Sequence, residues 1–147
     1  MKIYFTTLLL LLYGCASVNE KETTGFNEVL IKFNTQIPEK EHVYILIPPF
    51  SCHGCVQKMI SKIDIYLSPQ DKPYVTFISG IADIDLKIFS SRAVVYTDTH
   101  NYLEQLPFDI ANVTVVETKK SMLSKVYSIS LEDIENRINE KMFSFED

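Results

Sequence analysis

Two cysteines three residues apart are the residues of this sequence best suited to covalent chemistry, and they form the motif Cys52-His53-Gly54-Cys55. The continuous apolar run 43–47 precedes the motif and predicts a buried strand. Apolar residues at spacings of three and four follow, and they predict an amphipathic helix over 52–67 with Ser51 as its cap. A helix N-terminus offers free N–H groups and the positive end of the helix dipole. The first cysteine is therefore expected to form a thiolate readily, and a protonated His53 would add to this effect.

The spacing of the two sulfurs suits thiol-disulfide exchange. We expect Cys52 to be exposed and to act as the attacking nucleophile, and Cys55 to be shielded and to act as the resolving thiol. Cys52 would attack a partner's disulfide and form a mixed disulfide, which Cys55 would then release. His53 and Gly54 are the variable pair that supports this site, and Phe50 would add a hydrophobic rim for a protein partner.

Three other interpretations of the cysteine pair stay open. A purely structural disulfide would contribute roughly 2 kcal/mol at best, because it closes a very short loop. A metal site, with copper favoured over zinc, would draw on the two thiols and on His42, His53 and His100, whereas zinc prefers four ligands. A non-catalytic binding module would keep the motif only as part of a binding face. On balance we predict no resident metal and no cofactor.

The N-terminus has the layout of a secretory signal. Lys2 gives it a positive start, and the apolar run 3–13 is too short for a membrane span, which needs about 20 residues. The run ends in Leu12-Tyr13-Gly14-Cys15, which resembles the lipobox of bacterial lipoproteins, although the tyrosine is larger than the residue usual there. This resemblance implies removal of the signal peptide and acylation of Cys15, for example with palmitate. The alternatives are a transmembrane helix, or a plain signal peptide with an incidental cysteine.

The lipobox resemblance divides the chain into three parts. Residues 1–14 are the expected signal peptide, residues 15–27 the lipidated cysteine and a flexible tether, and residues 28–147 a single domain. The polar composition of 16–25 is typical of such a tether. The domain would lie in the cell envelope on the periplasmic or surface side of a membrane, with the outer membrane favoured.

The charge balance argues against a nucleic-acid partner. The chain has a net charge of −5 and no basic stripe, and an acidic domain repels phosphate backbones. Hydrophobic residues make up 46% of the chain and charged residues 22%, which suits one globular domain with an apolar core.

Hydrophobic periodicity predicts further strands and helices outside the motif. Alternating apolar residues at Val29, Ile31 and Phe33 predict a strand over 28–34. The other predicted elements are strands over 74–79 and 93–96, short helices over 82–89 and 101–106, a hairpin of 113–117 with 122–129 around Lys119-Lys120, and a helix over 131–142. Strands that alternate with helices and end in a hairpin and a helix indicate an α/β sandwich around a mixed sheet.

This order of elements, with CHGC between a strand and a helix, resembles the thioredoxin fold over residues 28–142. The additional strand at 93–96 makes the chain similar to membrane-anchored thiol-disulfide oxidoreductases, of which lipid-anchored forms occur in Bacteroidetes-like bacteria. The resemblance implies a thioredoxin-like three-layer sandwich with a central mixed sheet. It also implies a thiol-disulfide oxidoreductase that acts on protein thiols and disulfides of the envelope.

The sequence departs from that family at two places. The family has a cis-proline just before the first hairpin strand, where this chain has Asn112, and Pro107 lies five residues earlier. The change would alter the substrate groove and would expose the thiols to metal ions. The family's buried acid has no counterpart in the strand 43–47, so proton transfer to the resolving thiol would fall to water or to His53. A non-catalytic thioredoxin-like lipoprotein, or a copper or zinc module built on CHGC, is therefore the alternative function.

Overall fold

The computed structural model describes residues 18–67, 75–82, 84–85, 93–130 and 132. Within them the elements follow in the order α2 (Val18–Lys32), β1 (His42–Ile47), α3 (His53–Leu67), β2 (Val75–Ser79), β3 (Val94–Thr97), the 3-10 helix η3 (Tyr102–Gln105), β4 (Thr114–Lys119) and β5 (Met122–Ser128). The predicted signal peptide, Cys15 and most of the helices predicted over 82–89 and 131–142 lie outside the described residues.

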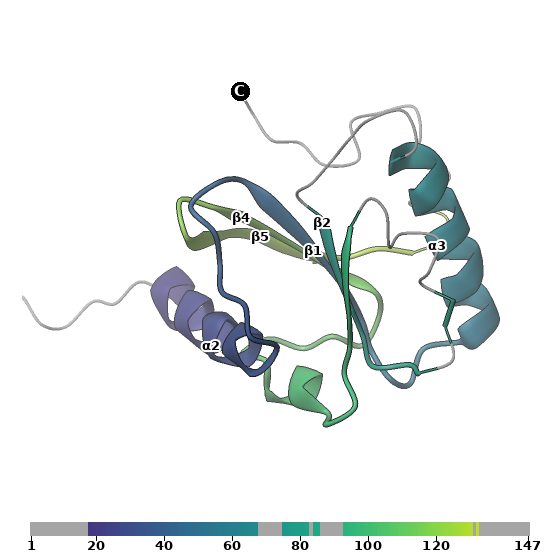
Figure 1. Cartoon of the computed structure of the whole chain (residues 1–147), viewed down its shortest axis with the longest axis horizontal. Helices are drawn as coiled ribbons and strands as arrows, with labels where there is room; N and C mark the ends of the chain where they lie inside the picture. The colour runs from purple at the N-terminus through teal and green to yellow at the C-terminus, as the bar shows by residue number, and fades with distance from the viewer. Residues whose placement is uncertain (1–17, 68–74, 83, 86–92, 131, 133–147) are drawn as a thin grey trace, which may run out of the picture.

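The strands form one mixed sheet in the order β3-β2-β1-β4-β5. Strands β1, β2 and β3 are parallel, and the hairpin β4-β5 continues the sheet with β4 antiparallel to β1. Figure 1 shows α2 on one side of the sheet and α3 on the other. The predicted three-layer α/β sandwich with a central mixed sheet is therefore confirmed by the strand order and the helix placement.

Strand β1 lies at the centre because both of its faces are covered. Alternate side chains of a strand point to opposite faces. Val43, Ile45 and Ile47 pack in the hydrophobic cluster that includes α3, whereas Tyr44 and Leu46 pack in the cluster that includes α2. All five are at most 1% exposed, so the continuous apolar run was a correct signal for a central strand.

The strand predicted over 28–34 is wrong, because these residues belong largely to helix α2. Phe26 and Leu30 are fully buried, and Val29 is 2% exposed, whereas Ile31 is 56% exposed. Burial therefore follows the helical spacing of three and four residues rather than strict alternation. The apolar pattern of a short segment can match both the strand period of two residues and the helix period of 3.6 residues. Here the match with the strand period is a coincidence.

Helix α2 also occupies most of the segment predicted to be a flexible tether. The helix begins at Val18, and its Thr23 Oγ1 accepts a hydrogen bond from the backbone N–H of Leu123 in β5, with the two atoms 3.1 Å apart. Phe26 packs edge-on against Tyr44 of β1, with 5.1 Å between ring centroids. Residues 18–27 are thus part of the folded body, and the prediction of a flexible tether over them is wrong.

The predicted hairpin is confirmed, with its loop at Lys120-Ser121, one residue later than predicted, and the structure shows how it turns without glycine or asparagine. Lys120 and Ser121 form the two-residue loop with φ of 54° and 58°, the left-handed values that a type I′ turn requires. Their backbone N–H groups donate to the carbonyls of Glu39 at 2.9 Å and Pro38 at 3.2 Å. These bonds to the neighbouring loop help to hold a backbone conformation that both side chains disfavour.

His42 at the start of β1 gives the fold a predictable pH dependence. Its Nε2 lies 2.8 Å from Thr76 Oγ1, and its ring packs on Tyr44 with 4.6 Å between centroids. Burial lowers the pKa of His42 from 6.5 to about 4. The unfolded chain therefore binds a proton near pH 6.5 while the folded chain stays neutral, so stability falls as pH drops from 6.5 to about 4.

We expect this histidine to remove about 1–2 kcal/mol of the free energy of unfolding between pH 7 and pH 4.5, less than the full shift because the side chain is partly exposed to solvent. Urea unfolding of the wild type and of His42→Gln at both pH values would measure it. The variant should lose less stability on acidification than the wild type. An equal loss in the two proteins would contradict the prediction.

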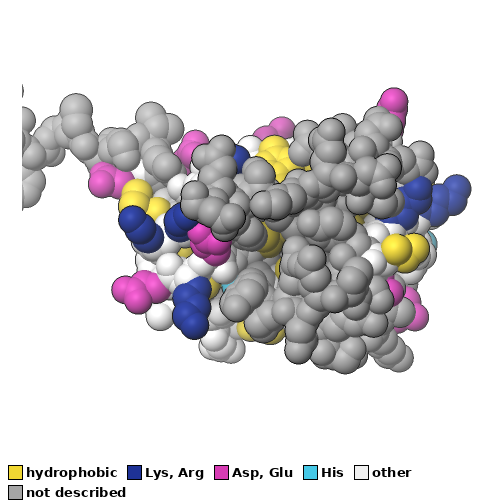
Figure 2. All heavy atoms as spheres, turned by 90° about the horizontal axis from the view of Figure 1, so that it is seen from above, with side chains coloured by type: hydrophobic (Ala, Val, Ile, Leu, Met, Phe, Trp, Pro, Cys, Tyr) yellow, Lys and Arg dark blue, Asp and Glu magenta, His cyan; other side chains and the backbone are white. Residues whose placement is uncertain are grey.

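Figure 2 shows the distribution of charge on one face of the molecule, and acidic and basic side chains are interspersed where the atoms are coloured.

No helix among the described residues combines the length and the apolar character that crossing a membrane requires.

Candidate redox site

The CHGC motif lies where the chain leaves the central strand and enters α3. Strand β1 ends at Ile47, and Pro48-Pro49 follows, whose rings fix φ and supply no N–H donor for a further strand. The N–H of Val56 donates to the carbonyl of Cys52 at 2.9 Å, which is the first hydrogen bond of the helix. Cys52 therefore occupies the N-cap position, and the prediction that Ser51 caps the helix is wrong by one residue.

The turn before the motif depends on Gly80 at the end of β2. The N–H of Gly80 donates to the carbonyl of Ile47 at 2.8 Å. A Cβ atom at residue 80 would lie 2.8 Å from Cδ and 2.9 Å from the backbone nitrogen of Pro49. The Pro-Pro turn thus packs directly on this glycine, and this contact fixes the path of the chain toward Cys52.

We expect Gly80→Ala to destabilise the protein by about 1–3 kcal/mol, because the added methyl group forces the Pro48-Pro49 backbone to shift. Gly54→Ala is the matched control, since a Cβ at residue 54 would meet nothing within 4 Å. Its stability should stay within about 0.5 kcal/mol of the wild type or rise, because alanine favours helix. Urea unfolding of the three proteins measures this. Equal midpoints for Gly80→Ala and the wild type would contradict the packing argument.

The two motif sulfurs are close to each other and accessible. Cys55 Sγ lies 2.8 Å from Cys52 Sγ and donates a hydrogen bond to it. Both cysteines are free thiols and both are exposed. The prediction that Cys55 is shielded is therefore wrong: the first turn of α3 leaves residue 55 on its outer side, while Val56 turns into the core.

The hydrogen bond between the sulfurs sets their acidities apart. The pKa of Cys52 is lowered by the bond from the Cys55 side chain, by the backbone N–H groups of Cys55 and Gly54, and by the positive charge of Lys58. The pKa of Cys55 is raised, first because its proton is held in that bond and further by the neighbouring thiolate. Of the two thiols, Cys52 is therefore the more acidic, and Cys55 keeps its proton more strongly.

The three supporting residues of the predicted site, His53, Gly54 and Asn112, are exposed. His53 and Gly54 are exposed on the first turn of α3. Asn112 is exposed two residues before β4, and its carbonyl accepts a hydrogen bond from Thr114 Oγ1 at 2.9 Å. The described residues contain no cis peptide bond. Pro107 packs instead on α2, where a Cβ at Gly25 would lie 3.1 Å from its ring.

Two of the three histidines considered as metal ligands, His42 and His100, have other partners than the cysteine pair. His42 is at the opposite end of β1, bonded to Thr76, and His100 stacks on Tyr102 with 5.2 Å between ring centroids. No group of three or more His, Cys, Asp or Glu that could hold a metal ion occurs in the described part of the chain. Among these residues, the cysteine pair has only His53 as a neighbouring ligand in sequence.

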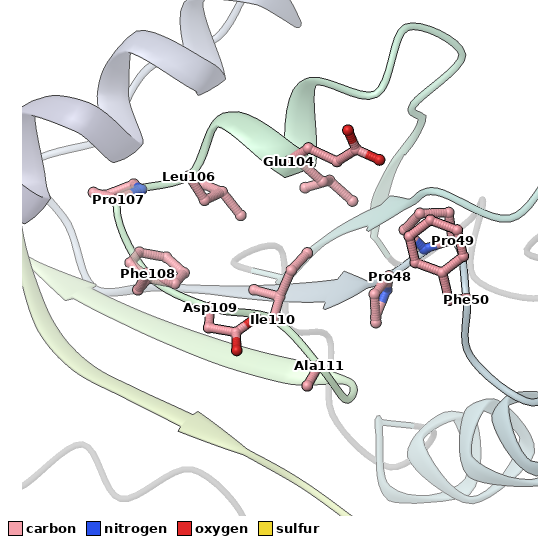
Figure 3. A pocket seen from close by; sticks show the side chains of 11 residues that line it. Pro48, Pro49, Phe50, Glu104, Leu106, Pro107, Phe108, Asp109, Ile110 and Ala111 are labelled. Atoms are coloured by element: carbon pink, nitrogen blue, oxygen red, sulfur yellow. The ribbon is translucent and has the colours of Figure 1, made fainter.

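Sequence reasoning missed a cleft beside the motif, which we call the Phe50 cleft. It has a volume of about 470 Å³ and is lined by residues 48–50 and by most of the segment 103–111. Figure 3 shows Glu104 on its η3 side and Asp109 on its β4 side. Only the position of Phe50 before the motif pointed to it, because the other wall comes from residues more than fifty positions later in the sequence.

No protein-family model and no curated protein matches the chain. A solution structure described as a putative thioredoxin from Neisseria meningitidis is similar to it. The two are 17% identical, the match covers 70% of this chain and 75% of that chain, and the TM-score is 0.42.

Proposed function

We propose that this chain is a thiol-disulfide oxidoreductase of the cell envelope that exchanges a Cys52–Cys55 disulfide with partner proteins. The observation that carries the proposal is the pair of exposed sulfurs 2.8 Å apart at the start of α3. A disulfide bond is about 2.05 Å long, so the sulfurs need to approach by less than about 1 Å to close it.

The reaction conserves electrons within the two sulfur pairs. The Cys52 thiolate attacks one sulfur of the partner's disulfide, that bond breaks, and the released partner thiolate takes a proton from water. Cys55 then loses its proton, to water or to His53, and attacks Cys52 Sγ. The mixed disulfide breaks, the partner leaves with two thiols, and Cys52 and Cys55 are oxidised to a disulfide. The reverse sequence would oxidise a partner.

A glutathione titration tests this function. The protein is equilibrated with buffers of graded ratios of reduced to oxidised glutathione, and the free thiols are alkylated and counted by mass spectrometry. We expect one transition in which both thiols disappear together, and faster reduction of a disulfide-bonded protein substrate in the presence of the chain. Thiols that neither oxidise nor reduce across the series would exclude the proposed function.

We further propose that the chain is exported and held on a membrane through acylated Cys15. The positive start, the short apolar run and the Leu12-Tyr13-Gly14-Cys15 sequence support this. Several acyl chains on one residue would give stable attachment, whereas a single chain binds only marginally. Labelling of cells with a palmitate analogue tests the anchor: the wild type should incorporate it and sediment with membranes, and Cys15→Ala should do neither.

A non-catalytic binding module is the second candidate, and the Phe50 cleft beside the motif is the observation that favours it. The double replacement Cys52→Ala/Cys55→Ala separates the two candidates. An oxidoreductase loses its biological role with this change, whereas a binding module retains it.

A further inference from the structure

The Phe50 cleft is built onto the same turn that presents the reactive sulfur. Its volume of about 470 Å³ lies within the range of ligand-binding pockets, roughly 300–1,000 Å³. Phe50 is two residues before Cys52, which is at most about 7 Å along an extended chain. A molecule that occupies the cleft can therefore extend to Cys52 without leaving the surface.

The walls of the cleft are largely apolar, and packing fixes both of them. Prolines, Leu106 and Ile110 line it, and Phe50 is 87% exposed, which is unusual for a large aromatic side chain. One wall is held where Pro49 packs on Gly80, and the other where Pro107 packs on Gly25. A partner that binds here spends little free energy on ordering these walls, because packing already fixes both of them.

The charged residues of the lining are both acidic. Glu104 on the η3 side and Asp109 on the β4 side are exposed, and the lining includes no lysine or arginine. The apolar surface between them suits a hydrophobic side chain, and the two carboxylates suit a cation beside it. An acidic occupant would meet like charges on both sides.

We propose that the Phe50 cleft binds a segment of the partner polypeptide in which a large apolar side chain stands beside lysine or arginine, close to the cysteine that Cys52 attacks. This inference rests on the proposed oxidoreductase function and names its substrate class. The short distance from Phe50 to Cys52 places the apolar and basic residues within a few positions of the partner's cysteine.

Peptide binding tests the cleft separately from the thiol chemistry. Fluorescently labelled nine-residue peptides, with serine in place of cysteine, are titrated into the full chain carrying Cys52→Ser and Cys55→Ser, and anisotropy is read. The peptides place Phe with two Arg, Phe with two Glu, or Ala with two Arg around the serine. We expect the Phe/Arg peptide to bind about 5- to 10-fold more tightly than either of the others, and more weakly at high salt.

Variants of the cleft test the same proposal, and a variant outside the cleft is the control. Glu104→Gln with Asp109→Asn should weaken the Phe/Arg peptide about 3- to 10-fold, and Phe50→Ser should weaken it by about 10-fold. Glu28→Gln with Glu132→Gln removes two exposed acids outside the cleft and should leave the affinity unchanged. Equal affinities for the Arg and Glu peptides, or an equal loss in the two double acid variants, would overturn the proposal.

A second measurement distinguishes the oxidoreductase proposal from the cleft proposal. The wild type is mixed with versions of the same peptides that contain cysteine and are linked by a disulfide, and the rate of disulfide exchange is measured. Equal rates and equal affinities for all peptides would overturn the cleft proposal and leave the oxidoreductase standing. The expected order of affinities without any exchange would overturn the oxidoreductase and keep the cleft as a peptide-binding site.

Discussion

Replacing Cys52 with serine is expected to abolish disulfide exchange, whereas Cys55→Ser is expected to stop the reaction at the mixed disulfide. A hydroxyl group cannot take the place of the attacking thiolate, so Cys52→Ser should fall to the uncatalysed rate. In Cys55→Ser the thiolate of Cys52 still attacks, but no second thiol releases the partner. Non-reducing gels of the two variants mixed with a disulfide-bonded substrate measure the adducts.

The exposure of Cys55 affects how the adducts of Cys52→Ser and Cys55→Ser compare. Because Cys55 is accessible, burial alone does not prevent it from attacking a partner when Cys52 is absent. In Cys52→Ser the bond to Cys52 and the Cys52 thiolate no longer raise the pKa of Cys55, but an ordinary thiol with a pKa of about 8.5 is still mostly protonated at pH 7, and only the thiolate reacts. We therefore expect few adducts of Cys52→Ser at pH 7 and more as pH rises toward the pKa of Cys55. Equal adduct formation by both variants at pH 7 would contradict the assignment of Cys52 as nucleophile.

The largest effect on stability is expected from Phe26→Ala in helix α2. Phe26 is fully buried and packs against the Tyr44 and Phe108 rings, with 5.1 Å and 5.9 Å between centroids. Removing a buried phenylalanine side chain costs about 3–5 kcal/mol, because both burial and packing are lost. Such a loss is a large part of the 5–15 kcal/mol that typically stabilises a domain. Urea unfolding followed by far-UV circular dichroism measures it.

Ile31→Ala in the same helix is the control for this experiment. Ile31 is 56% exposed, so its removal should change the free energy of unfolding by at most about 0.5 kcal/mol. Similar small effects of the two replacements would mean that α2 contributes no core packing and that the segment behaves as the tether suggested by its composition.

Local signals were sufficient to predict the centre of the fold. An unbroken apolar run identified β1, spacings of three and four identified α3, and two β-rich runs identified the hairpin β4-β5. Helix α2 was missed because its first half is polar and its second half matches two periodicities. The choice between them depends on the sheet face, built from Tyr44 and Leu46, that the helix covers.

The site was predictable in its residues but not in its surroundings. The CHGC spacing and the strand-to-helix junction are properties of one short segment. The exposure of Cys55 depends on which parts of the chain cover the first turn of α3, and no periodicity encodes this. The Phe50 cleft joins residues 48–50 to residues 103–111, and the close packing of Pro49 on Gly80 likewise joins distant segments.

Helix α2 begins only three positions after the proposed lipid anchor at Cys15. An extended chain covers at most about 3.6 Å per residue, so the acylated cysteine would lie within roughly 11 Å of the first helical residue. Figure 1 shows α2 and α3 on opposite flanks of the molecule. With so short a linker, the folded domain would lie against the bilayer with its α2 side, and the thiols would face the aqueous compartment. Freely diffusing proteins would then be better placed as substrates than proteins embedded in the same bilayer.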